Sequence, residues 1–276
     1  MTSYTHVVID DPAPFVRRVT LDRPEKRNAL NATLRRDILA ALREADADPD
    51  VRVTIVRGNG PTFCAGYDLT ASGDEYGVDA TEGSFQRSVV DGWISIWDLR
   101  KPVIAQIHGH CLAGGSELAT GCDLVYAADD AKIGYPAVRF GTPDMQYHAW
   151  LVGMRKGMEM MLTGDTLSGV EAAHYGFATA SYPAEELEAK VLEKAQRIAQ
   201  IPADVLQINK RTVHRAMDRM GFRDAIRAGT ELSAVAVHTD GFKAFIESAR
   251  EKGLTQALTA RDGAFGDGRL LTQSAT

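Results

Sequence analysis

One stretch of the chain combines a glycine-rich turn with a carboxylic acid. The β-prone run 102–107 leads into a loop that contains Gly109, Gly114 and Gly115. Glu117 follows in the first turn of a predicted helix. Glycine lets the main chain come close to a ligand, and a helix N-terminus presents N–H groups to negative charge. The stretch therefore predicts an anion-binding turn beside an acid. A packing turn and a residue that complements the helix dipole are the alternative interpretations.

Two further segments carry groups suited to the same kind of site. Residues 62–69 form a second strand-to-glycine-turn segment, in which Tyr67 follows Gly66. The polar loop 22–30 carries three cations close together in the sequence. Such a loop suits a ligand with anionic groups, and it equally suits a solvated charged turn.

The composition excludes several classes of protein. The chain has 276 residues, of which 45% are hydrophobic and 25% charged, with a formal net charge of −6. This mild acidity argues against a nucleic-acid binder, whose footprint is a basic face, and against affinity for anionic membranes. No apolar run reaches the ~20 residues that span a bilayer, and the N-terminus lacks a basic and apolar signal segment.

The cysteines indicate a reducing compartment. Cys64, Cys111 and Cys122 are odd in number, which does not fit a disulfide framework. Their spacing is not that of metal ligands, so no metal site is expected. We therefore expect a cytoplasmic protein.

Predicted strands and helices alternate up to about residue 200. The strands are expected at 6–10, 16–21, 51–57, 102–107, 123–127 and 132–135. The helices are expected from a cap at Asn31 or Thr33 to about 47, and at 85–99, 150–162, 169–175 and 184–201, with a turn at 181–183. Beyond residue 202 the pattern predicts helices only, at 205–220, 222–237 and 240–252. This order favours an α/β core over residues 1–200 and an all-helical region over residues 201–276.

Five segments, taken together, resemble the crotonase superfamily, also called the enoyl-CoA hydratase/isomerase family. They are residues 21–30, 63–69, 109–119, 122–125 and 158–165, and they occur in the family's order. The resemblance implies a spiral of β-β-α units with a C-terminal helical region that mediates trimerisation. It also implies a homotrimer, or a hexamer built as a dimer of trimers.

The resemblance further implies an active site for acyl-CoA thioesters. The family shares the stabilisation of a thioester enolate by two main-chain N–H groups, which fall here on Tyr67 and Gly114. Preorganised donors of this kind are most useful where negative charge develops on the carbonyl oxygen. Glu117 matches the first of the two catalytic glutamates of the hydratases, which exchange protons with water and substrate.

Coenzyme A enters as part of the substrate, and no tightly bound cofactor is implied. The loop 22–30 corresponds to the segment that lies along CoA in the family, and residues 65–69 resemble the wall of the adenine pocket. The residues implied in CoA binding are Arg23, Lys26, Arg27, Ala29, Ala65, Asp68 and Leu69.

At one position the chain departs from the hydratase pattern. The second catalytic glutamate is expected where this sequence has Ala137. An alanine cannot transfer protons, so a mechanism with two acid–base groups needs a replacement. Asp144 ranks first, because some relatives carry an acid in this loop. His148, Tyr147 and His110 are the alternatives.

The sequence therefore predicts an acyl-CoA enzyme of the enoyl-CoA hydratase/isomerase type. Its leading reaction is the addition of water to a 2-enoyl-CoA, with Glu117 as the acid–base residue. Ala137 keeps other crotonase reactions open, namely double-bond isomerisation, hydrolysis of a thioester or C–C bond, and decarboxylation. A non-catalytic acyl-CoA-binding subunit is the alternative from a different class. Neither nucleic acid nor membrane is expected as a partner.

Overall fold

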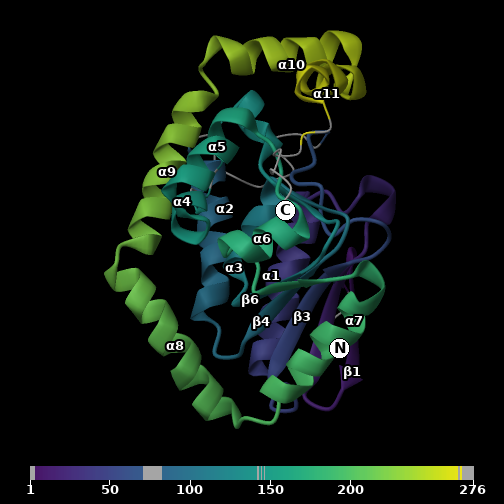
Figure 1. Ribbon diagram of the computed structural model, residues 1–276, viewed down its shortest axis with the longest axis vertical. Helices are drawn as coiled ribbons and strands as arrows, with labels where there is room; N and C mark the ends of the chain where they lie inside the picture. Colours follow the sequence, from purple (N-terminus) through teal and green to yellow (C-terminus); the bar gives the residue numbers. More distant parts are fainter. Residues whose placement is uncertain are drawn as a thin grey trace, which may run out of the picture.

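Two sheets form the framework of the molecule (Figure 1). The computed structural model describes residues 4–70, 83–141, 143, 145, 147–266 and 268. Within these residues, a six-stranded sheet has the strand order β1-β2-β3-β4-β6-β8, and a second sheet consists of β5 and β7. β1 runs antiparallel to β2, whereas every other neighbouring pair is parallel.

The strands follow most of the predicted β-prone runs. The large sheet contains β1 (Val7–Ala13), β2 (Val16–Leu21), β3 (Val53–Gly58), β4 (Val103–Ile107), β6 (Leu124–Ala128) and β8 (Ala180–Tyr182). The small sheet contains β5 (His110–Leu112) and β7 (Lys132–Gly134). β4 is buried along its whole length and β3 along most of it. Such burial is typical of central parallel strands that are covered on both faces.

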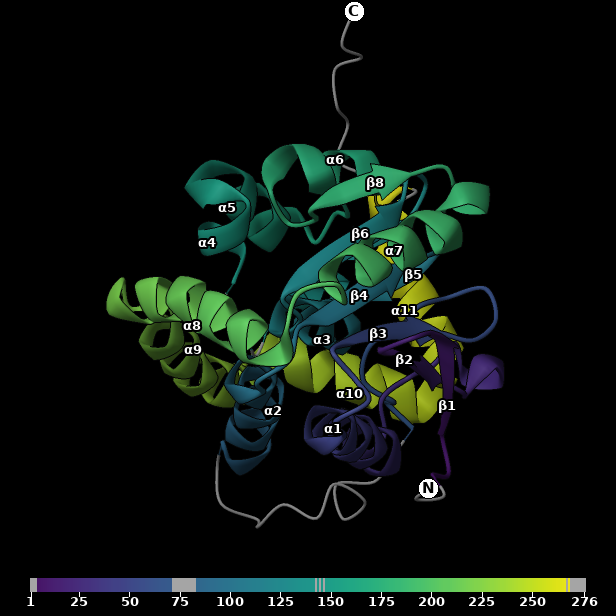
Figure 2. The same ribbon diagram turned by 90° about the horizontal axis from the view of Figure 1, so that it is seen from below.

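Helices cover both faces of the large sheet. α1 (Ala32–Ala47) begins at Asn31, whose side chain accepts a hydrogen bond of 2.8 Å from the main-chain N–H of Leu34. This bond identifies Asn31 as the helix cap. Figures 1 and 2 show α1 on one face of the sheet and α7 (Ala184–Ile198) on the other.

The other helices up to residue 183 surround the small sheet and the edge of the large one. The α-helices are α2 (Ser84–Ile94), α3 (Gly114–Gly121), α4 (His148–Leu151), α5 (Gly153–Thr163) and α6 (Gly169–Tyr175). This part of the chain also contains the short 3-10 helices η1 (Pro24–Lys26), η3 (Ser95–Asp98) and η4 (Pro136–Arg139). The helix predicted over 150–162 is thus two helices. The break follows Leu151, and α5 begins at Gly153, whose φ of 76° does not continue a right-handed helix.

Other predictions of secondary structure also differ from the structure: the helix predicted over 85–99 continues as η3 after Ile94, and the loop predicted after 107 contains β5. The turn predicted at 181–183 is wrong, because residues 180–182 form β8, which pairs with β6. A strand of three residues carries too little alternation to be recognised locally, and its pairing partner lies far away in the chain. The helix α11 (Leu254–Asp262) was not predicted. It follows Gly253 directly, and its apolar residues form no clear stripe.

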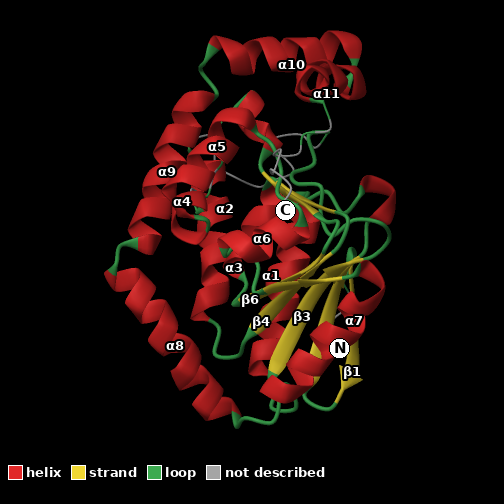
Figure 3. Ribbon diagram, viewed as in Figure 1, coloured by secondary structure: helices red, strands yellow, loops and turns green. Residues whose placement is uncertain are grey.

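The part of the chain after α7 folds into helices in all its described elements. These are α8 (Ala203–Arg219), α9 (Phe222–Ala236), α10 (Asp240–Lys252), α11 and the 3-10 helix η5 (Gly263–Phe265). In Figure 3, α8 and α9 run along one side of the molecule, and α10 and α11 lie across its end. Among the described residues, no helix has both the length and the apolar character needed to cross a bilayer.

A buried ionic cluster attaches α8 to the core. The Lys210 ammonium lies 2.9 Å from the Asp123 carboxylate and also donates to the carbonyl oxygens of Ile96 and Lys101, each at 3.0 Å. His214 Nε2 lies 3.0 Å from the same carboxylate. Since Asp123 immediately precedes β6, the cluster joins the helical region to a central strand of the sheet.

We predict that Asp123→Asn destabilises the protein by about 3 kcal/mol, because it leaves the buried Lys210 ammonium without its counter-charge. Chemical denaturation followed by circular dichroism measures this change. Asp91→Asn is the matched control, since Asp91 forms an exposed pair with Arg227 and its loss should cost less than about 1 kcal/mol. Equal free energies of unfolding for the two variants would contradict the importance of the cluster.

Candidate active site

A short parallel bridge brings the two glycine turns together. The main-chain N–H of Cys64 donates to His110 O at 3.0 Å, and the N–H of Leu112 donates to Cys64 O at 3.0 Å. These bonds pair Cys64 with Cys111 as neighbouring strands would be paired. The turn that begins at Cys64 therefore lies beside the loop that leads from β5 into α3.

The two turns are in close contact at Gly66 and Gly114. Gly66 has a φ of 103°, and a Cβ placed on it would lie 2.9 Å from the Ala113 Cβ and 3.6 Å from the main-chain nitrogen of Gly114. A Cβ placed on Gly114 would lie 2.7 Å from two ring carbons of Tyr67. The structure thus brings together Tyr67 and Gly114, the two residues that the sequence indicated as oxyanion donors.

Glu117 is buried next to this contact. It lies in the first turn of α3 and has no exposed surface. Tyr135 Oη donates to one carboxylate oxygen at 2.7 Å, and Tyr67 Oη donates to the other. The indole N–H of Trp93, on α2, donates in turn to Tyr67 Oη at 3.3 Å. A chain of hydrogen bonds therefore runs from Trp93 through Tyr67 to the Glu117 carboxylate.

The two phenol donors stabilise the buried Glu117 carboxylate. Hydrogen bonds to a charged acceptor are about twice as strong as those between neutral groups. The N-terminus of α3 adds a favourable field for negative charge. The group is suited to hold a water molecule and take its proton.

The residue before Glu117 fixes the start of the helix. Ser116 Oγ donates to Ala113 O at 2.8 Å and accepts a hydrogen bond from Tyr147 Oη. Burial raises the pKa of Tyr147 well above its usual value. The Tyr147 hydroxyl is therefore a structural donor that keeps its proton at neutral pH. Its bond to Ser116 holds the first turn of α3 in place.

His148 lies in the interior behind Tyr135. Its ring stacks on Tyr147 with centroids 4.2 Å apart and meets Tyr135 edge-on at 6.4 Å. Only 3% of His148 is exposed, and neither ring nitrogen has a hydrogen-bond partner among the described residues. Burial lowers the pKa of His148 to about 4. The imidazole is accordingly neutral at pH 7 and is not charged to act as an acid there.

The other positions considered for the second acid–base group lie in different surroundings. His110 pairs with Lys132 across β5 and β7. Burial lowers the pKa of His110, and the positive charges of Lys132 and Arg27 add to the effect. Ala137 occupies the first turn of η4. Asp144 lies outside the residues that the structure describes.

The residues implied in CoA binding fall into two groups. Arg23 and Asp68 are buried and form an ion pair at 3.1 Å, and Arg23 also donates to Ala29 O. Burial alone would raise the pKa of Asp68, but hydrogen bonds from Thr70 and Arg23 outweigh it and lower the pKa. The pair joins loop 22–30 to the turn that carries Tyr67.

The second group is accessible. Lys26, Arg27 and Leu69 are exposed, and Ala29 and Ala65 are partly exposed. The Ala65 N–H donates to Arg27 O at 3.0 Å, so the two segments run side by side. Lys26 and Arg27 are the cations of this loop that solvent can reach.

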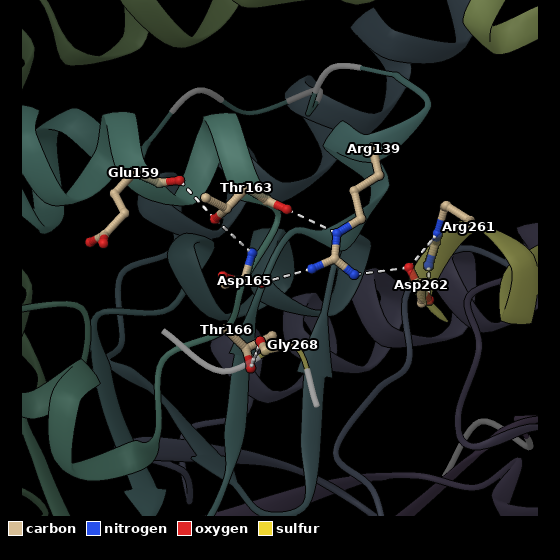
Figure 4. A network of polar contacts seen from close by, with 8 residues as sticks. All are labelled: Arg139, Glu159, Thr163, Asp165, Thr166, Arg261, Asp262 and Gly268. Atoms are coloured by element: carbon tan, nitrogen blue, oxygen red, sulfur yellow. Dashed lines mark hydrogen bonds and ion pairs between the residues drawn. The ribbon is translucent and has the colours of Figure 1, made fainter. Parts of the chain in front are cut away.

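Arg139 ties the segment after Tyr135 to the C-terminal helices (Figure 4). Its guanidinium donates to Thr163 O at 2.9 Å and forms ion pairs with Asp165 at 2.8 Å and with Asp262 at 2.9 Å. Asp262 is the last residue of α11. The network therefore anchors η4, which contains position 137, from two directions.

Sequence reasoning missed three features of the site. It assigned only the main-chain N–H of Tyr67, whereas the side chain contacts Glu117. It assigned no role to Tyr135 as a donor or to Trp93 as the neighbour of Tyr67. Tyr135 lies two residues before the position of the missing glutamate, and this closeness in sequence could have identified it as a residue of the site. Trp93 lies on a separate helix and gave no such signal.

Comparisons with known proteins identify the family. The family model described as enoyl-CoA hydratase/isomerase matches residues 14–263. The chain belongs to the enoyl-CoA hydratase/isomerase family. A putative enoyl-CoA hydratase of Mycobacterium tuberculosis is 35% identical over 234 residues, which cover 76% of this chain and 74% of that protein. A probable enoyl-CoA hydratase of Mycobacterium bovis is 33% identical and covers 83% of this chain and 90% of its own length.

A solved structure places the fold in the same superfamily. The crystal structure of an enoyl-CoA hydratase from Mycobacterium smegmatis is 33% identical in sequence and has a TM-score of 0.88. The match covers 96% of this chain and 95% of that one. The architecture is therefore the crotonase fold, as the sequence predicted.

We predict that His148 makes stability depend on pH. A histidine in the unfolded chain titrates near 6.5, whereas the folded pKa of His148 is about 4. Between these values the unfolded state binds the proton more readily, so stability falls as the pH drops. Through His148, the free energy of unfolding decreases by about 2 kcal/mol between about pH 7 and about pH 5.

Denaturation of the wild type and of His148→Phe at both pH values measures the effect. His148→Phe should not show this decrease in the free energy of unfolding at the lower pH. His174→Phe is the matched control, because His174 is exposed on α6 and its replacement should leave the pH dependence unchanged. The same pH dependence in wild type and His148→Phe would show that His148 does not carry it.

Proposed function

We propose that the protein adds water to the double bond of a 2-enoyl-CoA. The observation that carries this proposal is the buried Glu117 carboxylate beside the contact of Tyr67 with Gly114. The similarity to proteins named enoyl-CoA hydratase supports it. Coenzyme A would enter as part of the substrate.

In this reaction the two turns act on the thioester carbonyl. The main-chain N–H groups of Tyr67 and Gly114 would receive the carbonyl oxygen, which becomes negative as water attacks the β-carbon. One such donor typically contributes on the order of 3 kcal/mol of transition-state stabilisation. Glu117 would hold the attacking water and take its proton.

The accessible residues around this contact would bind the CoA moiety. Lys26 and Arg27 are exposed on the loop that runs beside Ala65, so they are placed to meet anionic phosphates. Ala29, Ala65 and Leu69 would contact the nucleotide. Arg23 and Asp68 would shape this surface through their buried ion pair.

A second candidate is another reaction of the same superfamily, and the alanine at position 137 favours it. Double-bond isomerisation, hydrolysis of a thioester or C–C bond, and decarboxylation all proceed through an enolate or a related oxyanion. The products differ in mass. Hydration adds one water, isomerisation adds nothing, decarboxylation removes carbon dioxide, and hydrolysis of the thioester releases free CoA.

We predict that the wild type converts members of a 2-enoyl-CoA panel, crotonyl-CoA included, to products heavier by one water, as measured by mass spectrometry. Glu117→Gln should reduce kcat by a factor on the order of 10² to 10⁴, because the amide cannot accept the proton. The matched control is Glu188→Gln, since Glu188 is an exposed residue of α7 that pairs with Arg18 and Arg57.

Several outcomes would contradict the hydratase assignment. Undiminished turnover in Glu117→Gln would remove Glu117 from the mechanism. A product of another mass would select one of the other crotonase reactions. Binding of CoA in calorimetry, with no product from any acyl-CoA, would point to a non-catalytic subunit.

We also propose that residues 201–276 form a region that mediates self-association into a trimer or a hexamer. α8 and α9 bury one face against the core, yet they expose apolar side chains as well. We infer that these side chains form an interaction surface. The exposed apolar residues of α8, α9 and the connection between them are Val205, Ile208, Val213, Met220, Leu232 and Val235.

We predict that the wild type sediments with three or six times the chain mass of 30.0 kDa in analytical ultracentrifugation. The double variant Ile208→Asp, Leu232→Asp should sediment as a monomer, because two carboxylates would be buried in the interface. Val170→Asp is the control, since Val170 is also an exposed apolar residue but lies on α6. A monomeric wild type would contradict the proposal.

A further inference from the structure

We propose that the phenol hydroxyl of Tyr67 gives the second proton of the hydration, in place of the glutamate that is absent at position 137. This inference rests on the proposed function. It assigns to the Tyr67 side chain a catalytic role that is separate from the oxyanion role of the Tyr67 main chain.

The first argument is the position of the hydroxyl. Tyr67 belongs to the turn that would bind the thioester carbonyl, and its ring lies against Gly114, the other residue of that site. The α-carbon is bonded directly to the carbonyl carbon. A carbonyl oxygen held by the two amides therefore brings the α-carbon close to this ring. The side chain is only partly buried, so a substrate can reach it.

The second argument is the hydrogen-bond chain. Tyr67 Oη donates to Glu117 and accepts from the Trp93 indole N–H at 3.3 Å. A donor to the phenol oxygen stabilises the negative charge that appears when the phenol gives up its proton. Trp93 is fully buried, so this donor is held in place. Trp93 is accordingly a positioning residue for Tyr67.

The third argument is the balance of protons. Glu117 takes a proton from water as the water oxygen bonds to the β-carbon, and the π electrons move onto the carbonyl oxygen. The enolate then re-forms the carbonyl, and the α-carbon takes the proton of Tyr67. The protonated Glu117 returns a proton to the phenolate through their direct hydrogen bond. One water is consumed, and both residues recover their starting states.

Tyr135 has a different role in this scheme. Its hydroxyl donates to the other oxygen of Glu117 at 2.7 Å, and only 5% of the residue is exposed. His148 packs edge-on against it, and Tyr147 stacks on His148. Tyr135 therefore orients the carboxylate from the interior, whereas Tyr67 reaches the same carboxylate from the side of the substrate.

Tyr67→Phe tests the proposal, because it removes the hydroxyl and keeps the ring and the main-chain N–H. The probes are crotonyl-CoA for hydration and butyryl-CoA for exchange of α-protons in D₂O, read by mass spectrometry. Butyryl-CoA has no double bond to hydrate, so its exchange reports on enolate formation and protonation alone. We expect kcat and exchange to fall by about 100-fold, with KM changed by less than about threefold.

Three further variants complete the experiment. Tyr182→Phe, on β8, is the matched control and should behave as the wild type. Trp93→Phe keeps the test decisive if Tyr67→Phe does not fold, and it should lower kcat and exchange by about tenfold through loss of one hydrogen bond. Asp144→Asn examines the acid that the sequence ranked first, and it should retain exchange.

The outcomes separate this inference from the proposed function. If Tyr67→Phe keeps rates of α-proton exchange and hydration within about twofold of wild type, the role of the Tyr67 hydroxyl is overturned. The same conclusion follows if Asp144→Asn loses both activities and Tyr67→Phe does not. A wild type that exchanges α-protons but hydrates no acyl-CoA would refute the hydratase function, while the Tyr67→Phe exchange rate would still decide the role of the hydroxyl. A wild type that does neither would refute both.

Discussion

The close approach of two main-chain turns is the constraint on which the active site depends. The turn after Cys64 and the N-terminus of α3 touch so closely that the glycine positions at their contact have no room for a side chain. A Cβ on Gly115 would lie 2.6 Å from the carbonyl oxygen of Cys64, and one on Gly114 would lie 2.7 Å from two ring carbons of Tyr67. The small sheet of β5 and β7 and the bridge between Cys64 and Cys111 maintain this approach. The main-chain N–H groups of Tyr67 and Gly114, the Tyr67 ring and Glu117 all take their positions from it.

The polar groups inside the site form a connected network. A buried carboxylate is costly unless hydrogen bonds compensate for the lost water, and such networks are rigid when their members are satisfied. Here the hydroxyls of Tyr67 and Tyr135 meet Glu117 from two sides, and Tyr147 fixes the preceding residue, Ser116. The site is therefore organised before a substrate arrives. Such preorganisation is the main source of electrostatic stabilisation in enzymes.

The sequence predicted the fold well where the signals were local or combined into family motifs. The strands of the large sheet up to β6, the cap at Asn31 as one of two choices, and the pairing of Tyr67 with Gly114 could all be read from it. Features that depend on contacts between distant segments could not be read from the sequence. β8 depends on β6, and the hydrogen bond from Trp93 to Tyr67 depends on how α2 packs. The buried state of Arg23 follows from its partner Asp68, although the sequence showed only a charged loop.

The contact between Asp123 and Lys210 has a consequence for the order in which the chain folds. It joins segments far apart in the sequence, and distant contacts form late because closing a long loop costs entropy. An ammonium is not buried before its carboxylate is in place, so α8 docks only after the start of β6 has folded. The apolar residues that α8 and α9 expose become a rigid surface only at that stage. Chains with an unfinished core therefore do not present the surface that we propose for self-association.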